Sequence, residues 1–204
     1  MNDLWYAMRA LRKSPGFALA AILTLAVAIA ADCVVFSVAD AVLFRPLPYK
    51  EPDRLYHVWC GWRGHPATFG ASRADFLDWK RRNSVFEDMA LTVSGSLDVR
   101  LGGSPEMIDA EWASVNLFPM LGIQPALGRT FSAEEGYTGR AEQVAMLSYD
   151  FWQSRFHGDP NIIGTQLDQG SGAKATVVGV LPAAFKFTYP KGPSIWIPLA
   201  LDRP

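Results

Sequence analysis

The chain has 204 residues, of which 50% are hydrophobic and 19% are charged, so it can bury a sizeable core and is not a disordered protein. Its 19 basic and 20 acidic residues give a formal net charge of −1, which excludes the basic field that holds a nucleic-acid backbone. Composition therefore predicts one or two compact units without a nucleic-acid partner.

The first 13 residues have the pattern of an amphipathic helix at a membrane surface. Apolar side chains recur at helical spacing, and three basic residues cluster immediately before the apolar run that follows. We expect residues 1–13 to form a cytoplasmic interfacial helix, with aromatic rings at the depth of the lipid headgroups. The stripe is Leu4, Trp5, Met8 and Leu11, and the basic cluster is Arg9, Arg12 and Lys13.

A long apolar run follows, and from Ser14 to Ala31 it contains no charged residue. Eighteen residues of α-helix span roughly 27 Å, close to the ~30 Å hydrocarbon core of a bilayer. The apolar pattern continues to Phe44, where prolines end it, so we predict a transmembrane helix over residues 14–45. Because basic residues flank its start, the N-terminus is expected in the cytoplasm and everything after about residue 45 outside.

Two other interpretations of residues 1–45 are open. A secretory signal would combine the same basic and apolar regions with a cleavage site near Ala28-Ile29-Ala30, but a cleaved signal does not need the apolar extension to Phe44. A buried helix of a soluble protein is disfavoured by the uncharged length and by basic residues at one end only. Asp32 and Asp40 lie at the outer end, share a helix face and would point toward water or partner helices.

The remainder predicts a mixed α/β domain after Arg45-Pro46-Leu47-Pro48-Tyr49. Ser72 and Ser148 resemble N-caps, and Gly122 a helix stop. Pro198 would confine the last strand to a sheet edge. The expected strands are 55–62, 91–101, 107–114, 143–147, 164–167, 174–181 and 195–199, and the expected helices are 72–83, 116–121 and one after 148.

We expect two core subdomains, 46–123 and 124–204. The chain stops directly after a predicted strand, with no helix returning to the membrane, so the second subdomain is expected to be incomplete and the chain to be a fragment.

No motif predicts catalysis, a cofactor or a metal. One thiol and two imidazoles, Cys60, His57 and His65, match no zinc spacing. The segment Gly170-Ser171-Gly172-Ala173-Lys174 lacks a third glycine and a hydroxyl residue after the lysine, so it predicts a hairpin turn and not a phosphate loop.

The serines and carboxylates of the chain are likewise interpreted without a catalytic role. Neither Ser72 nor Ser96 lies between two glycines as a nucleophile elbow requires. Four carboxylates in and after the first predicted core helix are interpreted as a solvated face: Asp75, Asp78, Glu87 and Asp88. We therefore predict no catalytic, cofactor-binding or metal-binding residues, no cofactor, and a protein that is not an enzyme.

Short motifs along nearly the whole chain resemble MacB/FtsX-like ABC transporter permeases, nearest to the duplicated orphan permeases without a fused ATPase. The N-terminal motifs are Asp3-Leu4, Arg12-Lys13-Ser14-Pro15-Gly16-Phe17, Phe36-Ser37-Val38, Ala41-Val42-Leu43 and Arg45-Pro46-Leu47-Pro48-Tyr49. The later ones are Asp75-Phe76-Leu77-Asp78-Trp79, Phe118-Pro119-Met120-Leu121-Gly122, Leu127-Gly128-Arg129-Thr130-Phe131, Leu147-Ser148-Tyr149, Phe151-Trp152, Arg155-Phe156, Val178-Gly179-Val180-Leu181-Pro182 and Trp196-Ile197-Pro198-Leu199.

This resemblance implies an α+β protein: an N-terminal transmembrane helix followed by a mixed α/β extracytoplasmic core domain of two subdomains. It implies the N-terminal part of a permease in a bacterial inner membrane, coupled mechanically to a separate cytoplasmic ABC ATPase for export or mechanotransmission. Other expected partners are the lipid bilayer, the remaining permease helices and a periplasmic adaptor protein. The alternative is a single-span, membrane-anchored extracytoplasmic binding or scaffold protein.

Overall fold

The computed structural model of the chain describes residues 15–40, 49–61, 64, 68–140, 143–170, 172–187 and 192–201. It divides into two compact units, Met1–Leu47 and Pro48–Pro204, which are described separately. The predicted interfacial helix over residues 1–13 lies outside the described residues.

The first unit contributes one long helix, α2, over Pro15–Ala39. Proline is favourable at the first position of a helix, where its missing N–H has no partner to lose. Large apolar side chains project from all sides, with Phe17 72% exposed. The hydroxyl of Thr24 donates to the carbonyl of Ala20 at 2.9 Å, so this polar group is satisfied within the helix. The stretch Pro15–Ser37 has a mean hydropathy of 2.5 and the length to cross a bilayer, and it is the one such helix in the described part of the chain.

The second unit is built of short helices and strands. Its helices are η2 (Pro52–Arg54), α3 (Arg73–Arg82), α4 (Leu117–Leu121), η3 (Ala133–Gly136), α5 (Tyr149–Phe156) and η5 (Pro160–Ile162). Its strands are β1 (Cys60–Gly61), β2 (Thr68–Phe69), β3 (Thr92–Leu101), β4 (Ser104–Ala113), β5 (Leu127–Gly128), β6 (Val144–Leu147), β7 (Gln166–Gln169), β8 (Lys174–Val180) and β9 (Ile195–Pro198).

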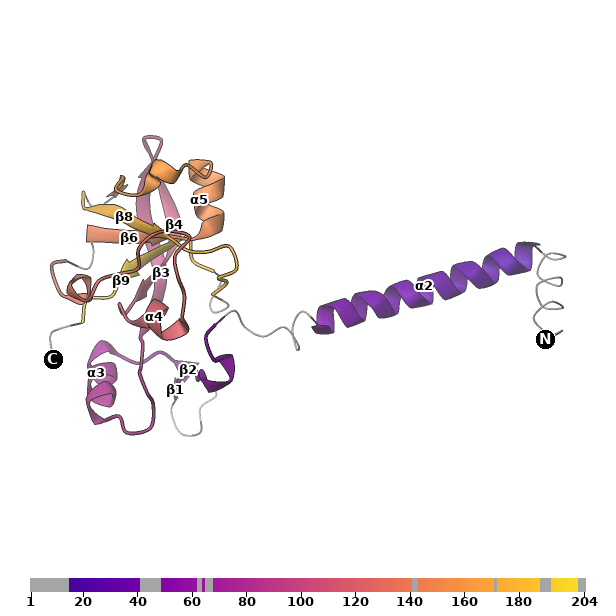
Figure 1. Cartoon of the computed structure of the whole chain (residues 1–204), viewed down its shortest axis with the longest axis horizontal. Helices are drawn as coiled ribbons and strands as arrows, with labels where there is room; N and C mark the ends of the chain where they lie inside the picture. Colours follow the sequence, from indigo (N-terminus) through magenta and orange to yellow (C-terminus); the bar gives the residue numbers. More distant parts are fainter. Residues whose placement is uncertain are drawn as a thin grey trace. The chain divides into compact units, whose positions relative to one another are not determined.

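Seven of these strands form a mixed sheet in the order β5-β8-β6-β9-β4-β3-β7. Because β7 also pairs with β8, six strands close into a ring and the sheet becomes a barrel. Figure 1 shows α5 beside the barrel, and α3 with the β1–β2 pair at the end where α4 lies. The expected α+β class is confirmed: an apolar helix is followed by a mixed β-barrel core with helices.

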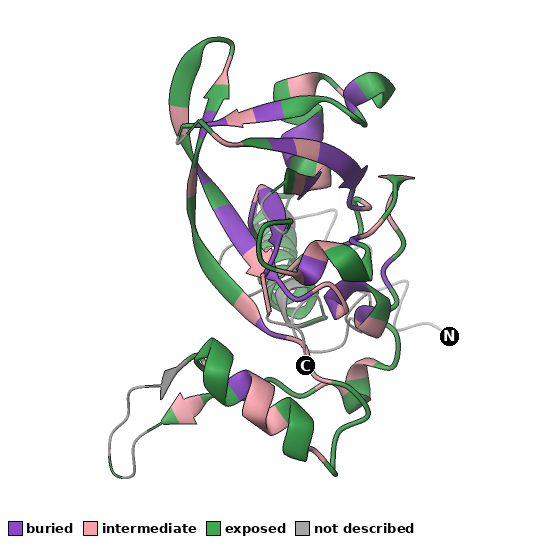
Figure 2. Cartoon of the chain, turned by 90° about the vertical axis from the view of Figure 1, so that its left-hand side faces the viewer, coloured by how far each residue is buried: buried purple, intermediate pink, exposed green. Residues whose placement is uncertain are grey.

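The core consists of two main clusters on opposite faces of the sheet. Successive side chains of a strand point to opposite faces, so Ile195 and Ile197 of β9 join one cluster while Trp196 joins the other. The first cluster gathers side chains from the six strands of the ring and from α5. The second is covered by α4 and includes Phe118, buried against Trp196. Figure 2 shows the buried residues concentrated on the strands.

Local signals in the sequence located several elements correctly. The Ser72 hydroxyl accepts from the Asp75 N–H at 3.1 Å at the start of α3, and the Ser148 hydroxyl caps α5 in the same way. Gly122 ends α4 in the left-handed conformation, with φ 70°. The β3–β4 hairpin turns at Gly102 and Gly103, between the two strands that were expected over 91–101 and 107–114.

Two strand predictions were wrong. The segment 55–62 is regular strand only at Cys60–Gly61 among its described residues. The last strand, β9, lies between β4 and β6 and not at an edge. Pro198 is tolerated there because β9 pairs with β6 only through Ile195 and Trp196, so the missing N–H of Pro198 interrupts no pairing with β6.

The division at residues 123 and 124 stays a prediction. The barrel takes strands from both sides of it, since β4 pairs with β9 in parallel.

Candidate functional site

The second unit begins at Pro48, and its first described residues, Tyr49 and Lys50, are hydrogen-bonded to residues far along the chain. The N–H of Lys50 donates to the carbonyl of Leu121 at 2.9 Å, at the end of α4. The hydroxyl of Tyr49 donates to the carbonyl of Lys186 at 3.0 Å, and its ring lies 6.1 Å from that of Phe185. Burial raises the pKa of Tyr49, so the phenol keeps its proton and stays a donor. Two adjacent residues therefore fasten the incoming chain at two places, and we call Tyr49 and Lys50 the anchor.

The anchor depends on a close approach at Gly122. A Cβ built at this position would lie 2.7 Å from the Cβ of Lys50. The same glycine has a positive φ and donates its N–H to the carbonyls of Phe118 and Pro119. Glycine is therefore required for two independent reasons, the helix stop and the contact with the anchor.

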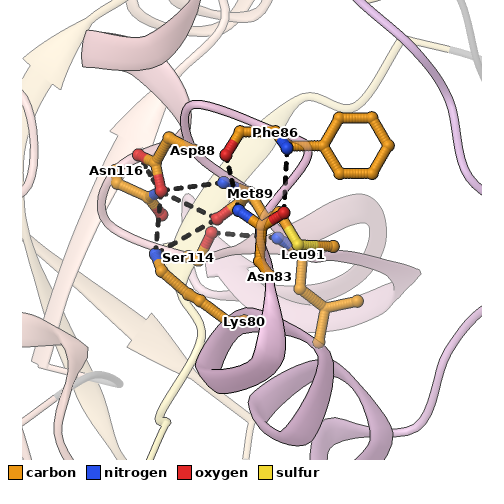
Figure 3. Close-up of polar contacts among 8 residues, drawn as sticks. All are labelled: Lys80, Asn83, Phe86, Asp88, Met89, Leu91, Ser114 and Asn116. Carbon is orange, nitrogen blue, oxygen red and sulfur yellow. Dashed lines mark hydrogen bonds and ion pairs between the residues drawn. The ribbon is translucent and has the colours of Figure 1, made fainter.

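A second set of contacts fastens α3 and the segment after it to the barrel (Figure 3). The Asn116 amide donates to Asp88 at 2.7 Å and to the carbonyl of Met89 at 2.9 Å. The Lys80 ammonium lies 3.1 Å from Asp88 and donates to the same Met89 carbonyl at 3.2 Å. Burial alone would raise the pKa of Asp88, but the hydrogen bonds from Asn116, the Met89 N–H and Lys80 outweigh it and lower the pKa.

Backbone pairing completes this attachment. The Leu91 N–H donates to the Ser114 hydroxyl at 3.0 Å, and the Ser114 N–H donates to the Leu91 carbonyl at 2.9 Å. Asn83 ends α3 and accepts from the N–H groups of Val85 and Phe86, which holds the turn shown in Figure 3. The α3 region is thus bonded to residues just before α4, whereas the anchor bonds Leu121 at the end of α4.

Apolar side chains are exposed on this region. Tyr56 is 75% and Val85 is 82% exposed, and the ring of Tyr56 lies 6.5 Å from that of Phe86. Val58 and Trp59 are exposed as well.

An ion pair orders the loop between β5 and η3. The Arg129 guanidinium binds Glu135 with two hydrogen bonds, of 2.7 and 2.9 Å, and Glu135 also accepts from the Ser132 N–H. Burial would raise the pKa of Glu135, yet these hydrogen bonds lower it overall. Ser132 and Glu135 form a capping box, whose Ser-x-x-Glu spacing is a signal that our sequence analysis missed.

One carboxyl group lies inside the sheet. Glu111 of β4 is 1% exposed, pairs across the strands with Ser94, and its Oε1 has no partner among the described residues. Burial raises its pKa, and hydrogen bonds with Ser94 and Thr92 offset this only in part. Burial thus stabilises the neutral form of Glu111 relative to its carboxylate.

The candidate metal ligands are not brought together in the described residues. The ring of His57 lies 4.1 Å from that of Trp59, and Cys60 is half-buried in β1. His65 lies outside the described residues. Among the residues that the structure describes, no three His, Cys, Asp or Glu side chains form a group that could hold a metal.

The other sequence candidates have structural contacts. Gly170 and Gly172 belong to the turn between β7 and β8, as predicted, and Gly172 donates its N–H to Gln169. Ser96 is an exposed residue of β3. The carboxylates of the α3 region pair with cations: Asp78 with Arg81 and Arg82, Glu87 with Arg54, and Asp88 with Lys80. The Asp75 carboxylate accepts from the Ser72 hydroxyl.

Comparison with known proteins gives one family and several similar folds. The family model described as "MacB-like periplasmic core domain" matches residues 18–203. The periplasmic region of MacB from Actinobacillus actinomycetemcomitans is 15% identical over 67% of this chain and 68% of its own length, with a TM-score of 0.46. The extracellular domain of the noncanonic ABC-type transporter YknZ from Gram-positive bacteria is 19% identical over 67% of this chain and 65% of its own length, with a TM-score of 0.48. No curated protein sequence matches the chain.

Proposed function

The chain belongs to the family of MacB-like periplasmic core domains of ABC-type permeases, and we propose that it is the N-terminal part of such a permease, coupled mechanically to a separate ATPase. The apolar helix α2 spans the inner membrane with its N-terminus in the cytoplasm, and the barrel lies outside. Within the family, the chain belongs with the duplicated orphan permeases that lack a fused ATPase.

The anchor is the observation that carries this proposal. Only eight residues separate Asp40, the last described residue of the first unit, from Tyr49. Two of the eight are prolines, and because proline fixes its φ angle, they reduce the number of backbone conformations available to this segment. Because Tyr49 and Lys50 are bonded to Lys186 and Leu121, a displacement of the chain at residue 49 is passed to two places on the barrel.

In this proposal the chain moves and binds partner proteins, and it catalyses no reaction. We propose that a cytoplasmic ABC ATPase dimer supplies the energy and that the remaining permease helices complete the membrane part. A periplasmic adaptor protein is the further partner, and the exposed apolar side chains of Tyr56 and Val85 suit such a contact. The chain itself is not an enzyme, and hydrolysis of generic ester or peptide substrates by the purified chain would contradict this.

Topology is tested with the full chain carrying an N-terminal tag in bacterial cells. We expect the chain to stay in the membrane after an alkaline wash, the tag to be protected in spheroplasts, and the barrel to be digested by added protease. Replacing Leu23 and Ile22 by arginine should release the chain, since each buried charge opposes insertion. A soluble wild-type chain cleaved near Ala30 would show that the segment is a signal peptide.

Coupling is tested against the alternative, a single-span binding or scaffold protein that works without an ATPase. The full chain is expressed with the remaining permease segments and an ABC ATPase, and a cysteine pair at positions 50 and 121 reports the anchor. Nucleotide binding to the ATPase should change the rate of disulfide formation in this pair. An unchanged rate, with the ATPase bound, would favour the scaffold alternative.

A further inference from the structure

One edge of the long strand β3 is uncovered over most of its length in the described part of the chain. On one side, β4 pairs with β3 from Thr92 to Leu101 without a bulge. On the other side, β7 pairs only with Val99 and Arg100. Among the described residues, the segment Thr92–Leu97 therefore has a neighbouring strand on one side only, and we call this segment the open edge.

Two hydrogen bonds show which backbone groups point out of the open edge. The carbonyl of Leu91 accepts from the Ser114 N–H at 2.9 Å, on the side of β4. The carbonyl of Asp98 accepts from the Gly170 N–H at 2.8 Å, on the side of β7. Successive residues of a strand direct their backbone groups to opposite sides, so the even-numbered residues of β3 face away from β4. Three residues therefore direct their N–H and C=O groups outward: Thr92, Ser94 and Ser96.

The open edge lacks the features that usually keep strand edges from pairing. Native proteins protect such edges with lysine, proline, inward-pointing charges or bulges. Residues 92–97 contain no charged residue and no proline, and their register with β4 is continuous. Val93 is 42% exposed, and Ser94, Gly95 and Ser96 are exposed as well. An incoming strand can therefore reach the outward backbone groups.

We propose that the open edge pairs, in antiparallel fashion, with the open edge of a second copy of this chain. The carbonyl of Asp98 is already bound to Gly170, so the pairing uses the three residues before it. One antiparallel register uses all three in both copies. It places Ser94 opposite Ser94 of the second copy, and Thr92 opposite Ser96. Each of these pairs then exchanges two backbone hydrogen bonds.

The side chains of the open edge are complementary to themselves in this register. Val93 and Gly95 lie on the same face as Trp112, the cross-strand partner of Val93. A Cβ built on Gly95 would lie 2.9 Å from Cζ3 of Trp112, so the indole ring occupies the place of a side chain there. Val93 of the second copy lies opposite Gly95 and packs against this ring. Because residues 92–96 are uncharged, two copies of the edge meet without repulsion, and this self-complementarity assigns a second copy as the partner.

The pairing is short, and the membrane compensates for its small area. Five residues from each copy bury far less than the ~1,600 Å² of a standard interface, so free chains associate weakly. Two chains that α2 holds in one bilayer meet at a much higher effective concentration. In this respect the inference rests on the proposed function.

Register-specific cross-linking of the full chain in bacterial membranes tests the pairing. Cys33 and Cys60 are first replaced by serine. Under mild oxidation, Ser94→Cys should form a disulfide-linked dimer at least about tenfold faster than Ser96→Cys, because only position 94 lies opposite itself. Ser96→Cys should regain the fast rate when it is co-expressed with Thr92→Cys. Equal rates at positions 94 and 96, or disulfides of Ser94→Cys with other proteins only, overturn the proposal.

Two substitutions at position 96 test the backbone hydrogen bonds. Ser96→Pro removes an outward N–H and keeps the bonds to β4, so it should weaken dimerisation at least about tenfold, measured by energy transfer between labelled chains in liposomes. Ser96→Ala keeps this N–H and should leave dimerisation unchanged. Undiminished energy transfer in Ser96→Pro chains that unfold like wild type overturns the proposal, since the chains then associate elsewhere. If Ser96→Pro does not fold, the cross-linking rates decide.

The two proposals fail in distinguishable ways. A chain that an alkaline wash removes from the membrane contradicts the membrane assignment, and cross-linking of the concentrated chain in detergent then tests the open edge by itself. A chain that stays in the membrane but shows no preference for position 94 contradicts the pairing and leaves the membrane assignment intact.

Discussion

The hydroxyl of Tyr49 donates a hydrogen bond of 3.0 Å to the backbone carbonyl of Lys186, 137 positions further along the chain. It joins the first residues of the second unit to the segment that follows β8. Four measurements test how far the fold depends on this contact, on Gly122, and on the carboxyl groups of Glu135 and Glu111.

Removing the Tyr49 hydroxyl should destabilise the fold modestly. Tyr49→Phe loses one hydrogen bond, worth about 1 kcal/mol, and keeps the ring contact with Phe185. Tyr49→Ala should cost roughly 2 to 4 kcal/mol because the packing is lost as well. Urea unfolding of the full chain in detergent micelles, followed by tryptophan fluorescence, measures both values. Equal stability of the Ala and Phe variants would mean that the ring does not stabilise the anchor.

The contact between Gly122 and Lys50 is tested with two glycine substitutions. Gly102→Ala is the control, because Gly102 has a similar φ of 61° and a Cβ there meets nothing within 4 Å. It should cost about 1 to 2 kcal/mol from the left-handed backbone alone. Gly122→Ala should cost at least about 1 kcal/mol more, because its Cβ would meet the Cβ of Lys50. Equal losses of unfolding free energy in Gly102→Ala and Gly122→Ala would show that the contact with Lys50 adds nothing to the cost at Gly122.

Glu135 should stabilise the fold at neutral pH and cease to do so in acid. Its pKa is lowered in the folded state, so its contribution is complete above the ordinary value of 4.5 and is lost as the pH falls through the folded pKa. Glu135→Gln should cost about 1 to 3 kcal/mol at pH 7, since Arg129 loses its charged partner. The difference from wild type should shrink between pH 5 and about pH 3 in unfolding titrations. A difference that does not vary with pH would contradict the ionised pair.

Glu111 should have the opposite pH dependence. Burial raises its pKa, so its protonated form is favoured in the fold and its stabilising effect is complete below 4.5 and lost as the pH rises through the folded pKa. Glu111→Gln keeps the shape of the protonated acid and cannot ionise. Wild type and variant should therefore be similar near pH 4 and diverge at higher pH, with the variant more stable. If the wild type instead gained stability relative to the variant as the pH rises, the ionised carboxylate of Glu111 would have to be stabilised by hydrogen bonds in the fold.

Local signals in the sequence were sufficient for several helices and hairpins. Ser72 and Ser148 as caps, and Gly122 as a stop, act through the nearest few residues, so the pattern alone predicts them. The barrel could not be predicted in this way, because β4 pairs with β9 across more than 80 residues of sequence. Pro198 misled the prediction because its effect depends on where β6 ends, which no local pattern records.

The contacts of the anchor could not be predicted from the sequence either, because they also join residues that are far apart along the chain. The sequence around Tyr49 indicates the end of an apolar helix, and nothing in its spacing indicates Lys186 or Leu121 as partners. Family resemblance supplied what spacing did not, namely that a core domain follows the first helix.

The central position of β9 fixes when the barrel can form. Until residues 195–198 are available, β4 and β6 are open edges, and the other strands of the ring make a curved, unclosed sheet. If the strands of the ring reach the outer compartment in chain order, closure waits for β9 to arrive. Assembly should then be slow and dependent on this late insertion, as is usual for folds dominated by distant pairings. A factor that binds open strand edges would recognise this intermediate, in which Ala110–Ala113 and Met146–Leu147 lack a neighbouring strand on the side that β9 later fills.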